Sequence, residues 1–126
     1  MEFEAQQPIY LQISDLICEN IMTQKWQEGG RIPSIREMAV ETEVNPNTIT
    51  RTYAYLQDRH IIQNQRGIGY FVAGSAAERT RELKKQEFIA RDLPRIFRTM
   101  EILKMEWKQV QEQYELYKRD KKGGDR

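Results

Sequence analysis

Hydrogen-bonding side chains gather in one short stretch of the chain, residues 45–51, which reads Asn-Pro-Asn-Thr-Ile-Thr-Arg. An arginine can donate two parallel hydrogen bonds to the edge of a guanine base, and asparagine and threonine can contact bases or phosphate oxygens. Candidates for such contacts in and around this stretch are Arg31, Ser34, Arg36, Asn45, Asn47, Thr48, Thr50, Arg51, Arg66 and Gly67. Arg51 is the best candidate for a guanine contact. These residue types favour recognition of a nucleic acid over bond-making chemistry.

The chain offers little for catalysis or for binding a metal. His60 is its only histidine and Cys18 its only cysteine, so a Ser-His-Asp or Cys-His arrangement cannot be assembled. No Cys/His cluster has the spacing of a zinc site. We expect Cys18 to be a small buried hydrophobe, because it lies in an apolar helical pattern, and His60 to end a helix. The sequence therefore predicts no enzyme, no metal site and no cofactor.

Two helix starts position the polar stretch. Ser34 and Glu37 have the spacing of a capping box, in which each side chain pairs with the backbone N–H of the other residue. Asn45 is a favoured N-cap, and Pro46 suits the first helical position. The pattern predicts one helix over residues 35–42 and a second from residue 46, joined by a connector of the length that a helix-turn-helix needs.

The second of these helices has one apolar and one polar face. Ile49, Tyr53 and Leu56 recur at helical spacing and predict its buried face. Val44 and Ile49 stand at the two positions of a hydrophobic staple. The side chains left on the N-terminal outer face are those of Asn47, Thr48, Thr50 and Arg51. In a recognition helix this is the part that reaches base edges in the major groove of DNA.

Residues 61–72 predict a β-hairpin after the second helix. Ile61 and Ile62 read as a strand, residues 65–69 as a Gly-containing turn, and residues 70–72 as the returning strand. A two-stranded hairpin is marginal alone, so it must pack on the helices. The order helix, turn, helix, hairpin predicts a winged helix-turn-helix, a mainly α fold with a small β-hairpin. A winged helix that binds another protein instead of DNA is the competing interpretation.

A further helix is predicted before this unit. Pro8 can open it, and it should end near Lys25, before Gly29 and Gly30. We expect Trp26 to fold back on its apolar stripe. The residues of that stripe recur at spacings of three and four: Ile9, Ile13, Leu16, Ile17 and Ile21.

The C-terminal part predicts two helices with a heptad seam. A capping box at Ser75 and Glu78 opens the first, and Pro94 interrupts the pattern. Beyond it, spacings of four and three alternate, which predicts one continuous helix over residues 95–119. The residues of this seam are Ile96, Met100, Leu103, Trp107, Val110, Tyr114 and Tyr117.

The seam has three interpretations: burial by the preceding helix within one chain, pairing of two chains, or an aromatic-lined pocket for a small molecule. We favour a homodimer, because so large an apolar stripe is unfavourable on a soluble monomer. The expected domains are a DNA-binding domain over 1–74, a helical dimerisation region over 75–120 and a disordered tail over 121–126.

Composition adds weaker constraints. The net charge is +1, and residues 31–74 hold five arginines against four acidic residues, so phosphate contacts must come from a few placed arginines and from helix N-termini. The sequence has no 18-residue apolar run and its start lacks a signal-peptide pattern, so we expect a cytoplasmic protein and no membrane partner.

Four blocks of the sequence resemble one family, the GntR-family bacterial transcription regulators. The blocks begin at Pro8, Gly30, Val44 and Arg66, occur in the family's order, and together span residues 8–72. The Val-Asn-Pro-Asn-Thr run and the short helical C-terminus are similar to the YtrA-type subfamily. The resemblance implies a dimerising pair of C-terminal helices in place of a full effector-binding domain. We expect such a dimer to span a pseudo-palindromic operator in double-stranded DNA.

The resemblance also carries residue roles. It places the family's arginine of the second helix at Arg36, the start of the recognition helix at residues 45–48, and the wing tip at Arg66 and Gly67. Pro46 and Thr50 stand where some members have arginines, which leaves more of the base contacts to Asn47 and Arg51. Arg59 and His60 replace a glycine usual after the third helix. A repressor is expected, and a small-molecule effector is possible but has no support in the sequence.

Overall fold

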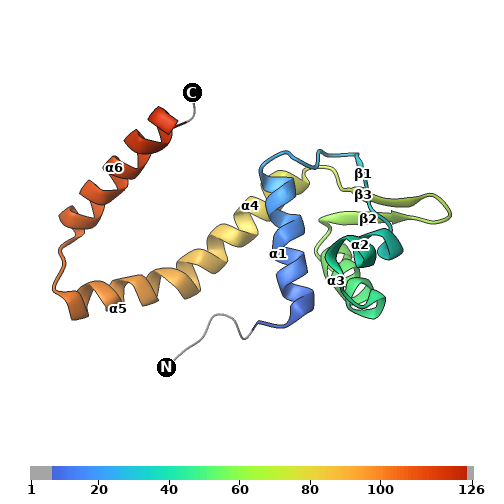
Figure 1. Cartoon of the computed structure of the whole chain (residues 1–126), viewed down its shortest axis with the longest axis horizontal. Helices are drawn as coiled ribbons and strands as arrows, with labels where there is room; N and C mark the ends of the chain where they lie inside the picture. Colours follow the sequence, from blue (N-terminus) through green and yellow to red (C-terminus); the bar gives the residue numbers. More distant parts are fainter. Residues whose placement is uncertain (1–6, 125–126) are drawn as a thin grey trace. The chain divides into compact units, whose positions relative to one another are not determined.

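The computed structural model describes residues 7–124, and Figure 1 shows the order of its elements. The helices and strands are α1 (Ile9–Met22), β1 (Arg31–Ile32), α2 (Ile35–Thr42), α3 (Pro46–Asp58), β2 (Ile62–Gln65), β3 (Gly69–Val72), α4 (Ala76–Glu87), the π-helical turn η2 (Phe88–Asp92), α5 (Leu93–Leu103) and α6 (Trp107–Gly124). The chain divides into two compact units, one ending at Lys84 and the other beginning at Lys85.

The first unit is a three-helix core with a small sheet. Both α1 and α2 pack against α3, and the side chains of Ile17, Ile49 and Leu56 are fully buried among them. The strands form an antiparallel sheet in the order β1-β3-β2, with Arg31 opposite Phe71 and Ile62 opposite Val72. The predicted fold class is confirmed: a mainly helical, winged helix-turn-helix unit.

The sheet has one strand more than the sequence predicted. The expected two-stranded hairpin is joined by β1, which pairs with β3 on the side away from β2. β1 is only two residues long, too short to produce an alternating pattern. Its pairing with Tyr70 and Phe71 supports the middle of β3 and leads directly into α2.

Helix α1 is shorter than predicted and turned differently. It ends at Met22 instead of near Lys25, and Gln24, just beyond it, takes a left-handed φ of 67°. Ile9 and Leu16, expected on the buried stripe, are 51% and 48% exposed. Ser14 and Cys18 are buried beside Ile13, Ile17 and Ile21 in their place, so the buried face is centred one position further along the helix. Burial of Cys18 and packing of Trp26 against the core are confirmed.

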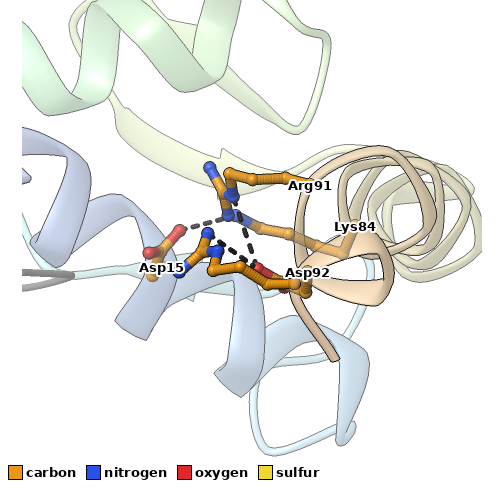
Figure 2. A network of polar contacts seen from close by, with 5 residues as sticks. Asp15, Lys84, Arg91 and Asp92 are labelled. Carbon is orange, nitrogen blue, oxygen red and sulfur yellow. Dashed lines mark hydrogen bonds and ion pairs between the residues drawn. The ribbon is translucent and has the colours of Figure 1, made fainter. Parts of the chain in front are cut away.

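The beginning of α4 belongs to the first unit. Ala76, Ala77 and Thr80 are buried in its core, so this unit extends beyond the domain boundary predicted after residue 74. Cationic side chains of α4 reach neighbouring elements: Arg81 donates to the Met22 carbonyl at 3.0 Å, and Lys84 pairs with Asp15 of α1 at 2.5 Å (Figure 2). Arg79 donates to the carbonyl of His60.

The second unit begins with a helix that contains a π-helical turn, η2. The turn lies just before Pro94, which has no N–H to donate to the preceding turn, so the regular helical ladder is interrupted there. Asp92 lies between two arginines, 3.5 Å from the Nε of Arg91 (Figure 2) and 3.6 Å from Arg95. The predicted interruption near Pro94 is therefore present, as a distortion and not as a break.

The continuous helix predicted over residues 95–119 is wrong. Lys104 adopts a left-handed φ of 58°, and its N–H bonds to Glu101 O at 3.2 Å while the N–H of Met105 bonds to Met100 O at 2.9 Å. This pair of bonds is a Schellman motif, which ends α5. The N–H of Glu106 then bonds to Gln109 Oε1 at 2.8 Å, which starts α6.

Helix α6 also runs further than the sequence predicted. It continues to Gly124, whereas a disordered tail was expected from residue 121. Lys121 and Lys122 lie in its last turn, where cations interact favourably with the negative end of the helix dipole. Residues 125 and 126 of the expected tail lie outside the described part of the chain.

Candidate nucleic-acid interface

The turn between α2 and α3 is built by two interlocking backbone motifs. Glu43 ends α2 with a left-handed φ of 56°, and the N–H of Val44 bonds to Ala39 O at 3.1 Å, again as in a Schellman motif. Val44 packs against the core, as expected from its place in the predicted staple with Ile49. Asn45 caps α3 through Oδ1, which accepts from the N–H of Asn47 at 2.7 Å. The short connector is therefore fixed at both ends.

The start of α2 is fixed by the predicted capping box. Ser34 donates its backbone N–H to Glu37 Oε1 at 2.8 Å, and the Glu37 N–H donates to Ser34 Oγ at 3.1 Å. These bonds lower the pKa of Glu37 below its ordinary value, with a smaller contribution from the charge of Arg31. Arg36 stands beside this cap, exposed on the first turn of α2. Its cation is therefore available at a helix end that attracts anions.

The polar residues of α3 differ in how much of their hydrogen-bonding capacity remains. Asn47 is exposed and Thr48 is half-buried at the helix start. Thr50 is exposed, but its hydroxyl donates to Pro46 O at 3.1 Å, which leaves it only an acceptor for an outside ligand. The side-chain oxygens of Ser34 and Asn45 accept the hydrogen bonds that cap α2 and α3. Among the described residues, the donors left on this surface are those of Arg51, of the Asn45 and Asn47 amides and of the Ser34 and Thr48 hydroxyls.

Arg51 is the candidate whose placement is best defined. Its guanidinium carbon lies over the ring of Tyr10 from α1, 4.0 Å from the ring centroid. With the first residues of α1 and α3 it lines one open hollow, formed by Pro8, Ile9, Tyr10, Asn47, Thr48 and Arg51. The sequence pattern does not predict Tyr10 as part of this surface, because α1 and α3 are far apart in sequence and no local pattern joins them.

The wing carries its candidates at the turn and at the sheet edge. Gly67 takes a φ of 75°, a left-handed conformation that favours glycine, and Arg66 beside it is exposed. Ile68, at the same tip, is 59% exposed and was not predicted to be. Arg31 lies against Gly69: a Cβ there would come within 3.0 Å of the Arg31 Nε. The missing side chain of Gly69 therefore makes the space in which Arg31 rests.

A buried tyrosine connects these parts. Tyr53 of α3 is fully buried, donates its hydroxyl to the Pro33 carbonyl at 2.7 Å, and meets the Tyr70 ring edge-on with centroids 4.8 Å apart. Burial, more than the nearby charges, raises the pKa of Tyr53 well above its ordinary value near 10. One neutral side chain thus ties α3 to the entry of α2 and to β3.

The electrostatic character of the surface comes from unpaired arginines. Within residues 7–124, no ion pair involves Arg36, Arg51 or Arg66. All three are exposed. They lie on the first turn of α2, on α3 and at the wing tip, so the candidate site consists of three groups on one folded unit. This arrangement can bind a polyanion through separate, placed cations.

The described residues contain no group of three or more His, Cys, Asp or Glu side chains that could hold a metal ion. His60 has a left-handed φ of 59° directly after α3, and the N–H of Ile61 bonds to Leu56 O at 2.9 Å. The prediction that His60 ends a helix is confirmed. The backbone there has the conformation that a glycine would adopt, although histidine occupies the position. None of the helices within residues 7–124 is long and apolar enough to cross a membrane.

The predicted seam residues of the second unit are open to solvent. Leu103 and Trp107 are each 61% exposed and Tyr117 is 60% exposed. Met100 and Val110 are half-buried, and Ile96 and Tyr114 are 40% and 56% exposed. In the described part of a single chain, most of the seam is therefore in contact with solvent.

Known proteins resemble this chain in sequence. The profile of bacterial regulatory proteins of the gntR family matches residues 9–72. The chain is 45% identical over 83 residues to the HTH-type transcriptional regulator YhcF of Bacillus subtilis. The matched residues make up 66% of this chain and 68% of YhcF. It is 35% identical over 69 residues to the HTH-type transcriptional repressor YtrA of the same organism, covering 55% and 53% of the two chains.

Two known structures extend the comparison. A crystal structure assigned to the GntR family, from Bacteroides thetaiotaomicron, matches with a TM-score of 0.76 and 39% identity, covering 90% of this chain and 99% of that one. The DNA-binding domain of AraR in complex with operator ORX1 matches with a TM-score of 0.54 and 26% identity, covering 57% and 87%. Since the profile matches more than half of the chain and YhcF is 45% identical over 83 residues, the chain belongs to the GntR family of bacterial transcription regulators, with a DNA-binding winged helix-turn-helix and no enzymatic role.

Proposed function

We propose that the chain is a sequence-specific repressor that binds a pseudo-palindromic operator as a homodimer in the cytoplasm. The observation that carries the proposal is the exposed Arg51 on the N-terminal outer face of α3, which forms no ion pair with any residue of the described range 7–124. Asn47 and Thr48 line the same hollow. Helix α3 enters the major groove with this face, while Arg36 binds phosphate and Arg66 follows the backbone or the minor groove.

The roles of the other candidates follow from their contacts. Ser34 and Asn45 hold the starts of α2 and α3 and offer those turns to phosphates. Thr50 contributes an acceptor at most. Gly67 shapes the turn at the wing tip, and Arg31 lies against Gly69 at the start of β3. The repressor role is supported by the relative YtrA, which is named a repressor.

The homodimer is supported by the exposed seam. Its large apolar residues, Leu103, Trp107 and Tyr117, are more than half exposed in a single chain, and pairing with a second copy would remove them from water. A dimer would place two copies of α3 on half-sites one or two helical turns apart, about 34 Å per turn. The small net charge of +1 makes two copies more effective than one.

A gel-shift experiment with genomic fragments at two salt concentrations tests the proposal. We expect a subset of fragments to be retarded, with binding that weakens steeply as the salt concentration rises. Retention of binding to those fragments over a scrambled competitor shows sequence preference. Absence of any salt-sensitive shift would instead favour a winged helix that binds a protein partner.

A further inference from the structure

Four side chains form a continuous stack across α1 and α3. The Arg51 guanidinium lies over the Tyr10 ring with a distance of 4.0 Å to the centroid. Tyr10 meets Tyr55 edge-on, with centroids 6.0 Å apart, and the Arg59 guanidinium lies 3.6 Å from the centroid of Tyr55. A cation therefore lies at each end of a tyrosine pair.

The geometry of the two helices accounts for the stack. Arg51, Tyr55 and Arg59 are spaced by four residues, so they lie along one stripe of α3. Tyr10 comes from the first turn of α1 and lies against this stripe. Its carbonyl lies 3.0 Å from the hydroxyl of the fully buried Thr52, whose one proton it shares with Thr48 O at the same distance. The ring therefore has a fixed base that does not depend on Arg51.

The stack restrains Arg51 without using its hydrogen bonds. A guanidinium contacts a ring through its face, whereas its five N–H donors point outward in its plane. Within residues 7–124 no acceptor pairs with these donors and no carboxylate neutralises the charge. By contrast, Arg81 and Arg79 donate to carbonyl groups. A long side chain that is already ordered loses less entropy when it binds.

We infer that Tyr10 is a positioning residue for DNA recognition, which holds the Arg51 guanidinium on the reading surface with its donors free. The inference rests on the proposed contact of Arg51 with a base. Tyr10 acts through its ring and through Arg51, and it needs no contact of its own with DNA. Sequence preference then depends on a residue of α1 that lies outside the helix-turn-helix.

Four variants of the full chain test this: Tyr10→Leu, Tyr10→Phe, Arg51→Ala and the double variant Tyr10→Leu/Arg51→Ala. Affinity for a selected operator fragment is measured by fluorescence anisotropy, with thermal unfolding as the control for folding. A cation–ring contact at an exposed site corresponds to roughly a two- to five-fold change in affinity. We expect that loss for Tyr10→Leu, less than half of it for Tyr10→Phe, and no added loss from Tyr10→Leu once Arg51 is removed.

The results distinguish a failure of the proposed Arg51 contact from a failure of the positioning role of Tyr10. If Arg51→Ala leaves operator affinity unchanged, the proposed role of Arg51 is wrong, and the positioning role falls with it. If Arg51→Ala weakens binding but Tyr10→Leu does not, only the positioning role is overturned. An equal loss in Tyr10→Phe and Tyr10→Leu would show that the Tyr10 hydroxyl contacts DNA directly. A loss from Tyr10→Leu that persists in the Arg51→Ala background would also contradict a role through Arg51.

Discussion

Arg36 and Arg51 are both exposed cations, but their positions suit different targets. Arg36 stands in the first turn of α2, where the positive end of the helix dipole already attracts phosphate. Arg51 lies further along α3, restrained against Tyr10 beside Asn47 and Thr48. A phosphate contact carries no sequence information, whereas a contact with a base edge does. The two residues should therefore affect binding in different ways.

This difference gives a first prediction. Arg51→Ala should lower affinity for the operator more than affinity for scrambled DNA, by about 1–3 kcal/mol of discrimination. Arg36→Ala should weaken binding to both sequences alike and reduce the salt slope by about one unit. Anisotropy titrations over a range of salt concentrations measure both quantities. An equal loss of specific and non-specific binding in the two variants would contradict these roles.

Tyr53 gives a prediction about stability. Tyr53→Phe removes the hydrogen bond to Pro33 O and leaves a carbonyl without its partner, which should lower the free energy of unfolding by about 1–3 kcal/mol. Because burial raises the pKa of Tyr53 in the folded state, its contribution is complete below pH ~10 and falls at higher pH, where the unfolded chain ionises first.

The difference in unfolding free energy between wild type and Tyr53→Phe should therefore shrink as the pH rises above ~10. Urea unfolding at neutral and alkaline pH measures it, and Tyr117→Phe, an exposed tyrosine in the second unit, is the matched control. A difference that is constant with pH would contradict the buried, neutral state of Tyr53.

At this scale, local chemistry was predictable and distant contacts were not. Ser34 with Glu37 and Asn45 with Pro46 signal helix starts within four residues of sequence, and both starts are confirmed. The stacking of Tyr10 on Arg51 joins residues 41 positions apart, which no spacing rule can detect. The contact of Arg31 with Gly69 likewise arises from the pairing of β1 with β3.

At the scale of elements, helix ends were harder to predict than helix starts. Glu43, His60 and Lys104 each take a left-handed conformation just after a helix, although none is glycine. The left-handed conformation costs a non-glycine residue about 1–2 kcal/mol. A helix end is therefore not expected at these residues from their type alone. That cost is offset by the Schellman hydrogen bonds and by packing of residues such as Val44.

The stability of two variants at Lys104 distinguishes a break between α5 and α6 from one continuous helix. With Lys104 left-handed, Lys104→Gly should be more stable than Lys104→Ala by about 1 kcal/mol, because only glycine escapes the Cβ penalty. In a continuous helix, alanine would be favoured over glycine by about the same amount. Thermal unfolding followed by circular dichroism ranks the two variants. A more stable Lys104→Ala would restore the uninterrupted helix that the heptad pattern predicted.

At the scale of the whole molecule, the exposed seam should determine the assembly. Besides its predicted members, Phe97 and Ile102 are 47% and 67% exposed on α5, so the apolar surface is wider than the heptad pattern indicated. Residues 31–74 carry few cations, so one winged unit offers few phosphate contacts. Two winged units held together would combine their phosphate contacts on one duplex.

A charged residue on the seam should therefore separate the chains. We expect Trp107→Glu to shift the protein from dimer to monomer at micromolar concentration, because a carboxylate would replace a large apolar contact. Lys108→Glu, next to it but outside the seam, should leave the dimer intact despite a larger change in charge. Sedimentation velocity measures both. A monomeric wild-type protein at that concentration would contradict the homodimer outright.

Whether two copies of α3 read one operator is tested by selection of bound genomic DNA followed by footprinting of the enriched fragments. We predict enrichment of a common inverted repeat, with two protected half-sites centred one or two helical turns apart and two chains bound per duplex. In Arg51→Ala the repeat should lose its enrichment. Selection that yields no shared sequence, or protection of a single half-site by one chain, would contradict the account.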